Sequence, residues 1–107
     1  MQNFSKMMKQ AQKLQTEMAT VQEKVAQQEV EGISGAGLIK VRLNGKGDVL
    51  SIFIDASLMN PDEKDVLEDL IVAALGDGKQ KSEAMMAEEM QKLMGDMKMP
   101  GGLSLPF

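Results

Sequence analysis

The sequence predicts an α+β fold: a long N-terminal helix, a three-stranded antiparallel sheet and a long C-terminal helix, in that order. Two observations predict it. Apolar residues recur at helical spacing near both ends of the chain, and between them short alternating runs are separated by glycines. The 107 residues form one domain, and extended helices leave little chain for a compact core. We therefore expect the chain to have a partner.

The N-terminal segment carries a heptad pattern over about three repeats. Its apolar residues follow one another at spacings of 3, 4, 3, 4, 3 and 4: Phe4, Met7, Ala11, Leu14, Met18, Val21 and Val25. This predicts a helix over residues 3–27, about 37 Å long at 1.5 Å per residue. A coiled-coil seam of this length needs another helix, which a second copy of the chain can supply. A homodimer is expected.

Three strands are predicted between the helices, over residues 29–34, 37–43 and 48–54. Ile39, Val41 and Leu43 alternate with the cations Lys40 and Arg42, as in a half-buried strand. Residues 35–36 form the first turn, and residues 44–48, NGKGD, supply the positive-φ positions that a hairpin needs. We place Phe53, in the third strand, in the core.

The second helix is predicted over residues 61–97. Asn60 caps it, Pro61 stands in its first turn, and Glu63 completes a capping box. Its sheet-facing side is formed by Leu67, Leu70, Ile71, Ala74 and Leu75. Gly76 and Gly78 each weaken a helix by about 1 kcal/mol relative to alanine, so we expect a kink or short break at 76–78. Residues 100–107 are expected to form a flexible tail.

Composition argues against an enzyme. Gly32, Gly35 and Gly37 do not form a phosphate-binding loop, because such a loop opens a helix and these glycines lead into a strand. The chain has no cysteine and no histidine, which removes thiol metal sites and the commonest general base. Asp55 and Asp62 could bind a metal, but they are better explained as strand-end and helix-start residues. No cofactor, metal or small-molecule substrate is expected.

The sequence also lacks targeting features. It has neither an apolar run long enough to span a membrane nor the apolar core of a signal peptide. A cytosolic bacterial-type protein fits best.

Charge is unevenly distributed, although the formal net charge is −4. Lys6, Lys9 and Lys13 lie at i, i+3 and i+7 with no acid among residues 1–16, whereas five acids stand between residues 62 and 69. The three lysines form either an ordinary solvated face or a binding face. From this pattern alone both interpretations stay open.

A second narrow stripe follows in the distal part of the second helix, at Met86, Met90, Leu93 and Met97. Such a stripe usually packs on another helix, and methionine also makes adaptable docking surfaces. The alternative function is therefore a chaperone-like or scaffold protein that holds protein partners with Met-rich helical arms.

Taken in order, several segments resemble the YbaB/EbfC nucleoid-associated family. They are the heptad helix, Ser34-Gly35-Ala36-Gly37-Leu38, Asn44-Gly45, Asp55-x-Ser57-Leu58 and the block from Leu67 to Ala74. The resemblance implies a tweezer-like homodimer with projecting helices. It also implies low-specificity binding of duplex DNA in the bacterial nucleoid, effects on compaction and gene expression, and no enzyme activity. The chain departs from related sequences at Gly76 and Gly78, and it has fewer basic residues in the second helix.

Given that resemblance, lysines are the first candidates for contacting DNA, because neutralising phosphates releases counterions without reading sequence. The candidate DNA-binding residues are Lys6, Lys9, Lys13, Lys79 and Lys81. Arg42 is the sole arginine, so bidentate base readout is poorly supplied. Three phenylalanines provide no stacking platform for single strands.

Overall fold

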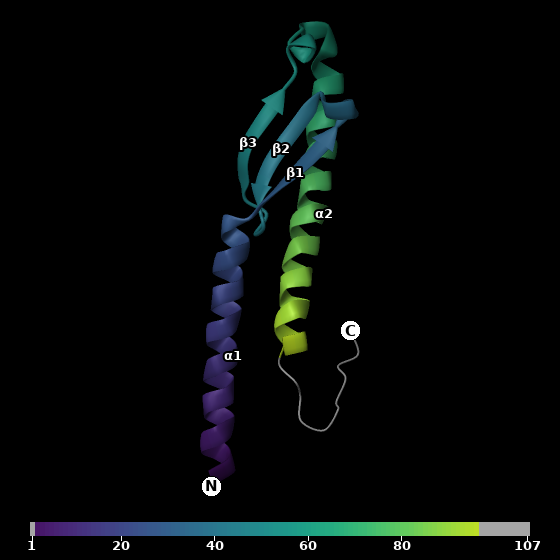
Figure 1. The fold of residues 1–107 in the computed structure, drawn as a ribbon. Helices are drawn as coiled ribbons and strands as arrows, with labels where there is room; N and C mark the ends of the chain where they lie inside the picture. Colours follow the sequence, from purple (N-terminus) through teal and green to yellow (C-terminus); the bar gives the residue numbers. More distant parts are fainter. Residues whose placement is uncertain (1, 97–107) are drawn as a thin grey trace.

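The computed structural model describes residues 2–96 and has the predicted α+β architecture. Helix α1 spans Gln2–Gln27 and helix α2 spans Lys64–Asp96. Between them lie strands β1 (Glu29–Ser34), β2 (Ile39–Asn44) and β3 (Val49–Ile54), which form an antiparallel sheet in that order. Figure 1 shows α2 running along the sheet and then beside α1. Met97 and the predicted tail at 100–107 lie outside the described residues.

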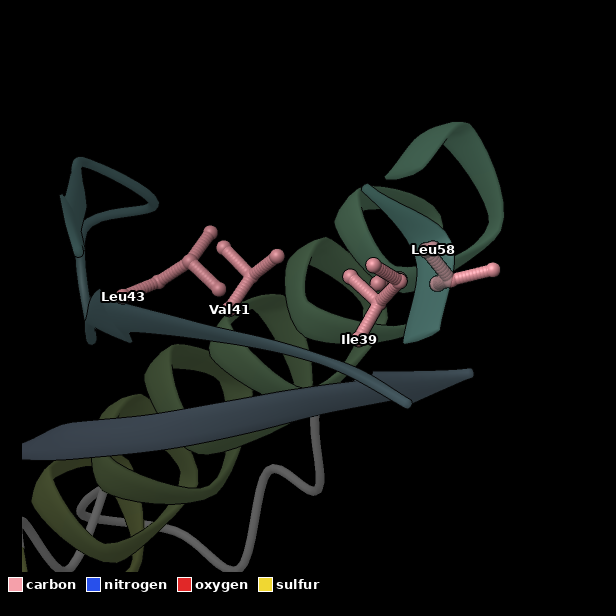
Figure 2. Close-up of a cluster of buried hydrophobic side chains, with 5 residues drawn as sticks. Ile39, Val41, Leu43 and Leu58 are labelled. Carbon is pink, nitrogen blue, oxygen red and sulfur yellow. The ribbon is translucent and has the colours of Figure 1, made fainter. Parts of the chain in front are cut away.

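The core lies between β2 and the first half of α2. Ile39, Val41 and Leu43 are fully buried on one face of β2, and Leu58 and Ala74 join them. Figure 2 shows the three β2 side chains projecting from the same face of the strand, with Leu58 beside Ile39. The predicted sheet-facing residues of α2 are confirmed: Leu67, Leu70, Ile71 and Leu75 pack against this cluster.

Helix α2 runs without a break through Gly76–Gly78, so the expectation of a short break there was wrong. Gly78 is explained by packing, because it lies against Gly32 of β1. A Cβ added at Gly32 would collide with the Ala74 carbonyl and stand 2.6 Å from the Gly78 nitrogen. These two glycines let the helix and the strand approach backbone to backbone, and packing there outweighs the low helix propensity of glycine.

The first turn is left-handed. Gly35, Ala36 and Gly37 have φ values of 58°, 55° and 97°, which explains the two glycines flanking an alanine. Because these residues turn the chain, β2 begins at Ile39 rather than at residue 37 as predicted.

The second turn is organised by Asn44, whose side-chain oxygen accepts hydrogen bonds from the backbone nitrogens of Lys46 (2.9 Å) and Asp48 (3.0 Å). Gly47 has a positive φ of 91°. Gly45 instead allows a close approach to α1, because a Cβ there would collide with Val25. Its N–H donates to the Val25 carbonyl at 3.0 Å, at the end of α1. The hairpin thereby fixes the end of α1 on the sheet, and β3 begins at Val49.

The predicted cap of the second helix is present with a small shift. Asn60 accepts a hydrogen bond from the Asp62 backbone nitrogen at 3.1 Å, and Pro61–Glu63 form a 3₁₀ turn. The α-helix proper therefore starts at Lys64 rather than at residue 61.

Strand β3 is not covered as expected. Phe53 is 51% exposed, so its assignment to the core was wrong. Alternation along a strand does not reveal whether a second layer covers it, and α2 packs on β1 and β2. Val49, Leu50 and Ile52 are exposed as well, which leaves an apolar edge strand.

In the second half of α1, the heptad seam packs against α2 of the same chain. Val25 is fully buried, and Leu14, Met18 and Val21 are half-buried along α2. Phe4, in contrast, is 70% exposed near the free end of α1. This end extends past the last described turn of α2 (Figure 1).

Candidate nucleic-acid interface

Lys6, Lys9 and Lys13 lie on the exposed first half of α1, at spacings that place them along one side of the helix. The Lys13 ammonium is 4.0 Å from Glu17, which is a weak i,i+4 pair. Lys6 and Lys9 form no ion pair with any residue between 2 and 96. We call this exposed first half of α1 the α1 arm. A ligand can bind its lysines with little loss of intramolecular contacts.

Lys81 is placed differently, because its ammonium group is already engaged. It donates to the Glu31 carbonyl at 2.8 Å and lies 2.9 Å from the Asp77 carboxylate. A hydrogen bond from the Ile33 amide, together with Lys81, holds the pKa of Asp77 below its ordinary value. Lys81 thus fastens β1 to α2. Lys79 is exposed and has no ion-pair partner among residues 2–96.

The two predicted lysine sets do not come together within one chain. Val25 of α1 and Met85 of α2 both lie beside Gly45, which fixes how the two helices align. At 1.5 Å per residue, the lysines of the α1 arm are then about 30 Å from Lys79 along the molecule. Any surface that includes both sets needs a second copy of the chain or a ligand that spans this distance.

Most other cations among residues 2–96 are paired with acids. Lys24 and Lys92 lie 3.1 and 3.6 Å from Glu89, whose pKa is lowered first by the Lys24 hydrogen bond. Arg42 lies 3.6 Å from Glu29. Lys46, which is not among the five predicted lysines, is exposed at the tip of the β2–β3 hairpin. Its position between two turn glycines was the available signal.

Acidic side chains gather at the opposite end of the molecule from the α1 arm. Asp62 and Glu63 stand in the turn that opens α2, and Asp65, Glu68 and Asp69 follow in its first turns. The amide ends of this turn and helix favour negative charge. The structure therefore separates the acidic end from the lysines of the arm along its long axis.

The remaining acids give no sign of a metal site. Asp55 accepts hydrogen bonds from the backbone nitrogen and hydroxyl of Ser57, at 3.0 and 2.6 Å, and so caps a turn. Across residues 2–96, no group of three acidic side chains is positioned to hold a metal ion. In the same range, no helix has the length and apolar character needed to cross a membrane.

An apolar groove of about 530 Å³ lies between the two helices, below the sheet. It is lined by Leu14, Met18, Ala87, Met90, Gln91 and Met94. Of the predicted stripe, Met90 lines this groove opposite Leu14 and Met18 of α1, whereas Met86 lies nearer the β2–β3 hairpin beside Gly45. Met97, the last residue of the predicted stripe, lies outside the described part of the chain.

Comparison with known proteins identifies the family to which these features belong. The sequence profile of the YbaB/EbfC DNA-binding family matches residues 1–97, which include every helix and strand described above. The chain belongs to the YbaB/EbfC DNA-binding family. All five predicted DNA-contacting lysines lie within the matched residues.

Relatives in this family match over the full length. The chain is 53% identical over 107 residues to a nucleoid-associated protein of Rhodospirillum rubrum, and 50% identical over 107 residues to one of Granulibacter bethesdensis. In both comparisons all of each chain is covered. A crystal structure of an uncharacterized protein from Helicobacter pylori is similar at a TM-score of 0.71 and 26% identity. That match covers 88% of this chain and 95% of the other.

Proposed function

We propose that the chain is a non-enzymatic, nucleoid-associated protein of the cytoplasm that binds duplex DNA as a homodimer with low sequence specificity. By covering and bridging DNA it would influence compaction and gene expression. The observation that carries the proposal is the row of exposed lysines on the projecting α1 arm, in a chain of a DNA-binding family. The names of its relatives support the location.

The chemistry of the arm favours phosphate contacts over base contacts. Lys6, Lys9 and Lys13 are point charges on long flexible side chains, which attract phosphates without selecting a base sequence. Arg42, the sole arginine, is paired with Glu29 on the outer face of the sheet. The acidic end of the molecule repels DNA, so the arm is the end that approaches the duplex.

Homodimerisation is proposed to occur through β3. Val49, Leu50, Ile52 and Phe53 expose apolar surface on an edge strand that no helix covers. The strand sequence, VLSIFI, has no charged residue, so two copies would not repel each other there. A two-fold contact of β3 with itself would bury this surface and place two α1 arms on one dimer.

The apolar groove supports a second candidate function, the binding of protein partners by Met-rich arms. An apolar segment of a partner would occupy the groove that Met90 and Met94 line together with Leu14 and Met18 of α1. This candidate predicts that binding depends on Met90 and changes little with moderate salt. The DNA proposal predicts the reverse.

A titration of labelled duplex DNA at two salt concentrations tests the proposal and separates it from the alternative. We expect binding at low salt that weakens steeply at higher salt, with little difference between unrelated sequences. A Met90→Gln variant should bind DNA as the unsubstituted chain does. Absence of duplex binding at low salt would overturn the proposal.

A further inference from the structure

The sheet has two edge strands, β1 and β3, and they differ in the hydrogen bonds made by their outward-facing backbone groups. At the β1 edge, the Ile33 amide donates to the Asp77 carboxylate at 2.9 Å, and the Glu31 carbonyl accepts from the Lys81 ammonium at 2.8 Å. The two side chains also lie 2.9 Å from each other. Two of the backbone groups that would face solvent on this edge strand are thus taken up by side chains of α2.

These are the groups that an added strand would use. Residues 31 and 33 flank Gly32, which pairs with Val41 on the β2 side. The Glu31 carbonyl and the Ile33 amide point to the other side, where a neighbouring strand would supply one donor and one acceptor. Lys81 supplies the donor and Asp77 the acceptor. The side chains therefore occupy the place of a pairing residue.

The close glycine contact holds this arrangement in register. Gly78 lies between Asp77 and Lys81 on α2 and touches Gly32. A Cβ added at Gly78 would lie 3.4 Å from the Gly32 Cα. Because backbone meets backbone there, the short Asp77 side chain reaches the strand edge. The glycine contact is at Gly32 itself, and the Asp77–Lys81 pair binds the residues on either side of it, Glu31 and Ile33.

The β3 edge has no such closure. Within residues 2–96, no side chain makes a hydrogen bond to the backbone of β3. Four of its side chains are apolar and exposed: Val49, Leu50, Ile52 and Phe53. An edge of this kind pairs readily with another strand. The sheet is consequently closed at one edge and open at the other.

We propose that Asp77 and Lys81 close the β1 edge against an added strand of a second copy, so that self-association through β3 stops at two chains. This inference rests on the proposed homodimer. A sheet with one open edge makes a closed two-fold contact, whereas a sheet with two open edges can pair head to tail without limit. The partner that the opened β1 edge would accept is the extended backbone of another copy.

The test compares Asp77→Ala/Lys81→Ala with Lys64→Ala/Glu68→Ala. The control pair also lies at i,i+4 on α2, at 3.4 Å, and its removal leaves the net charge equally unchanged. Sedimentation velocity over a concentration series is expected to show species larger than two chains for the first variant. The control should stay at the mass of the unsubstituted protein.

Hydrogen exchange at the Ile33 amide gives a second readout. The amide should exchange faster in dilute Asp77→Ala/Lys81→Ala and become protected again as the larger species form. Lys81→Met, which keeps the apolar stem of the side chain, should show the same direction of change if the double variant does not fold. A variant that keeps the mass of the control at every concentration would overturn the proposal.

A monomeric unsubstituted protein would refute the homodimer and leave this test intact. The closure of the β1 edge is judged from the difference between the variant and its control. If Asp77→Ala/Lys81→Ala associates and its control does not, the result still supports the inference.

Discussion

At the scale of single residues, two glycines that are two positions apart in α2 have different roles. Gly78 faces Gly32, whereas a Cβ at Gly76 would meet no atom within 4 Å. The sequence shows both as helix-weakening residues. Contacts with Gly32 of β1 and with the Leu43 side chain of β2 distinguish Gly78, and these contacts depend on where the helix crosses the sheet.

Opposite effects on stability are therefore expected from two glycine-to-alanine changes. Gly32→Ala should destabilise the fold by about 1–3 kcal/mol, because its methyl group would overlap backbone atoms of α2 that cannot move aside. Gly76→Ala should stabilise it by about 1 kcal/mol through helix propensity. Urea unfolding of both variants measures the difference. Equal effects would show that the two backbones do not meet at Gly32.

Glu89 gives the contact between the helices a dependence on pH. Lys24 of α1 and Lys92 of α2 lower the pKa of Glu89, so its ionised form is favoured by folding. A lowered pKa contributes stability above the value of the unfolded chain, about 4.3, and this contribution disappears as pH falls through the lower folded value. The ion pair should therefore stabilise at neutral pH and be lost in acid.

The variant Glu89→Gln tests this. At pH 7 its urea midpoint should lie below that of the unsubstituted chain, and the gap should close as the pH falls below about 4. Glu88→Gln is the matched control, since Glu88 is exposed and lies 3.9 Å from Lys92 alone. A gap that stays constant with pH would show that the Glu89 charge does not couple the helices.

At the scale of elements, periodicity predicted the kinds and order of the segments, and β1 falls on the predicted residues 29–34. Local chemistry moved other boundaries: the left-handed turn at Gly35–Gly37 delays β2, and the 3₁₀ turn at Pro61–Glu63 delays α2. Phe53 and the supposed helix break could not be read from the sequence. Both depend on the position of α2 over β1 and β2, which is a property of the tertiary packing.

The candidate site was predictable to a similar degree. Spacing placed Lys6, Lys9 and Lys13 on one side of an exposed helix, as the structure has them. It could not show that Lys81 is held by Asp77 and by the Glu31 carbonyl, because that hydrogen bond joins residues 50 positions apart. Lys79 and Lys81 thus differ, although they are near neighbours in the sequence.

Phe4 and Phe53, which are both exposed, separate two possible dimer interfaces. Phe53→Lys should dissociate the dimer at micromolar concentration, because it places a charge in the apolar strand proposed to pair with a second copy. Phe4→Lys makes the same change on the α1 arm and should leave the dimer intact. Equilibrium sedimentation measures both. Dissociation by Phe4→Lys alone would move the interface to the unpaired half of the heptad seam.

At the scale of the whole molecule, the fold separates its tasks along one axis. The acidic start of α2 lies at one end, the sheet with its open β3 strand lies in the middle, and the α1 arm with its lysines projects at the other end (Figure 1). A dimer formed through the sheet would carry two such arms. In the proposed function, the α1 arms therefore bind DNA and the sheet forms the dimer.

The measurement that tests this assignment most directly is the salt dependence of duplex binding by Lys6→Gln/Lys9→Gln/Lys13→Gln. If each lysine neutralises one phosphate, the slope of log K against log salt should become less steep by about 2.7 per DNA-contacting chain, at about 0.9 per contact. Lys64→Gln, an exposed charge removed from the acidic end, should leave the slope unchanged. A triple variant with the slope of the unsubstituted protein would contradict the assignment of DNA binding to the α1 arm.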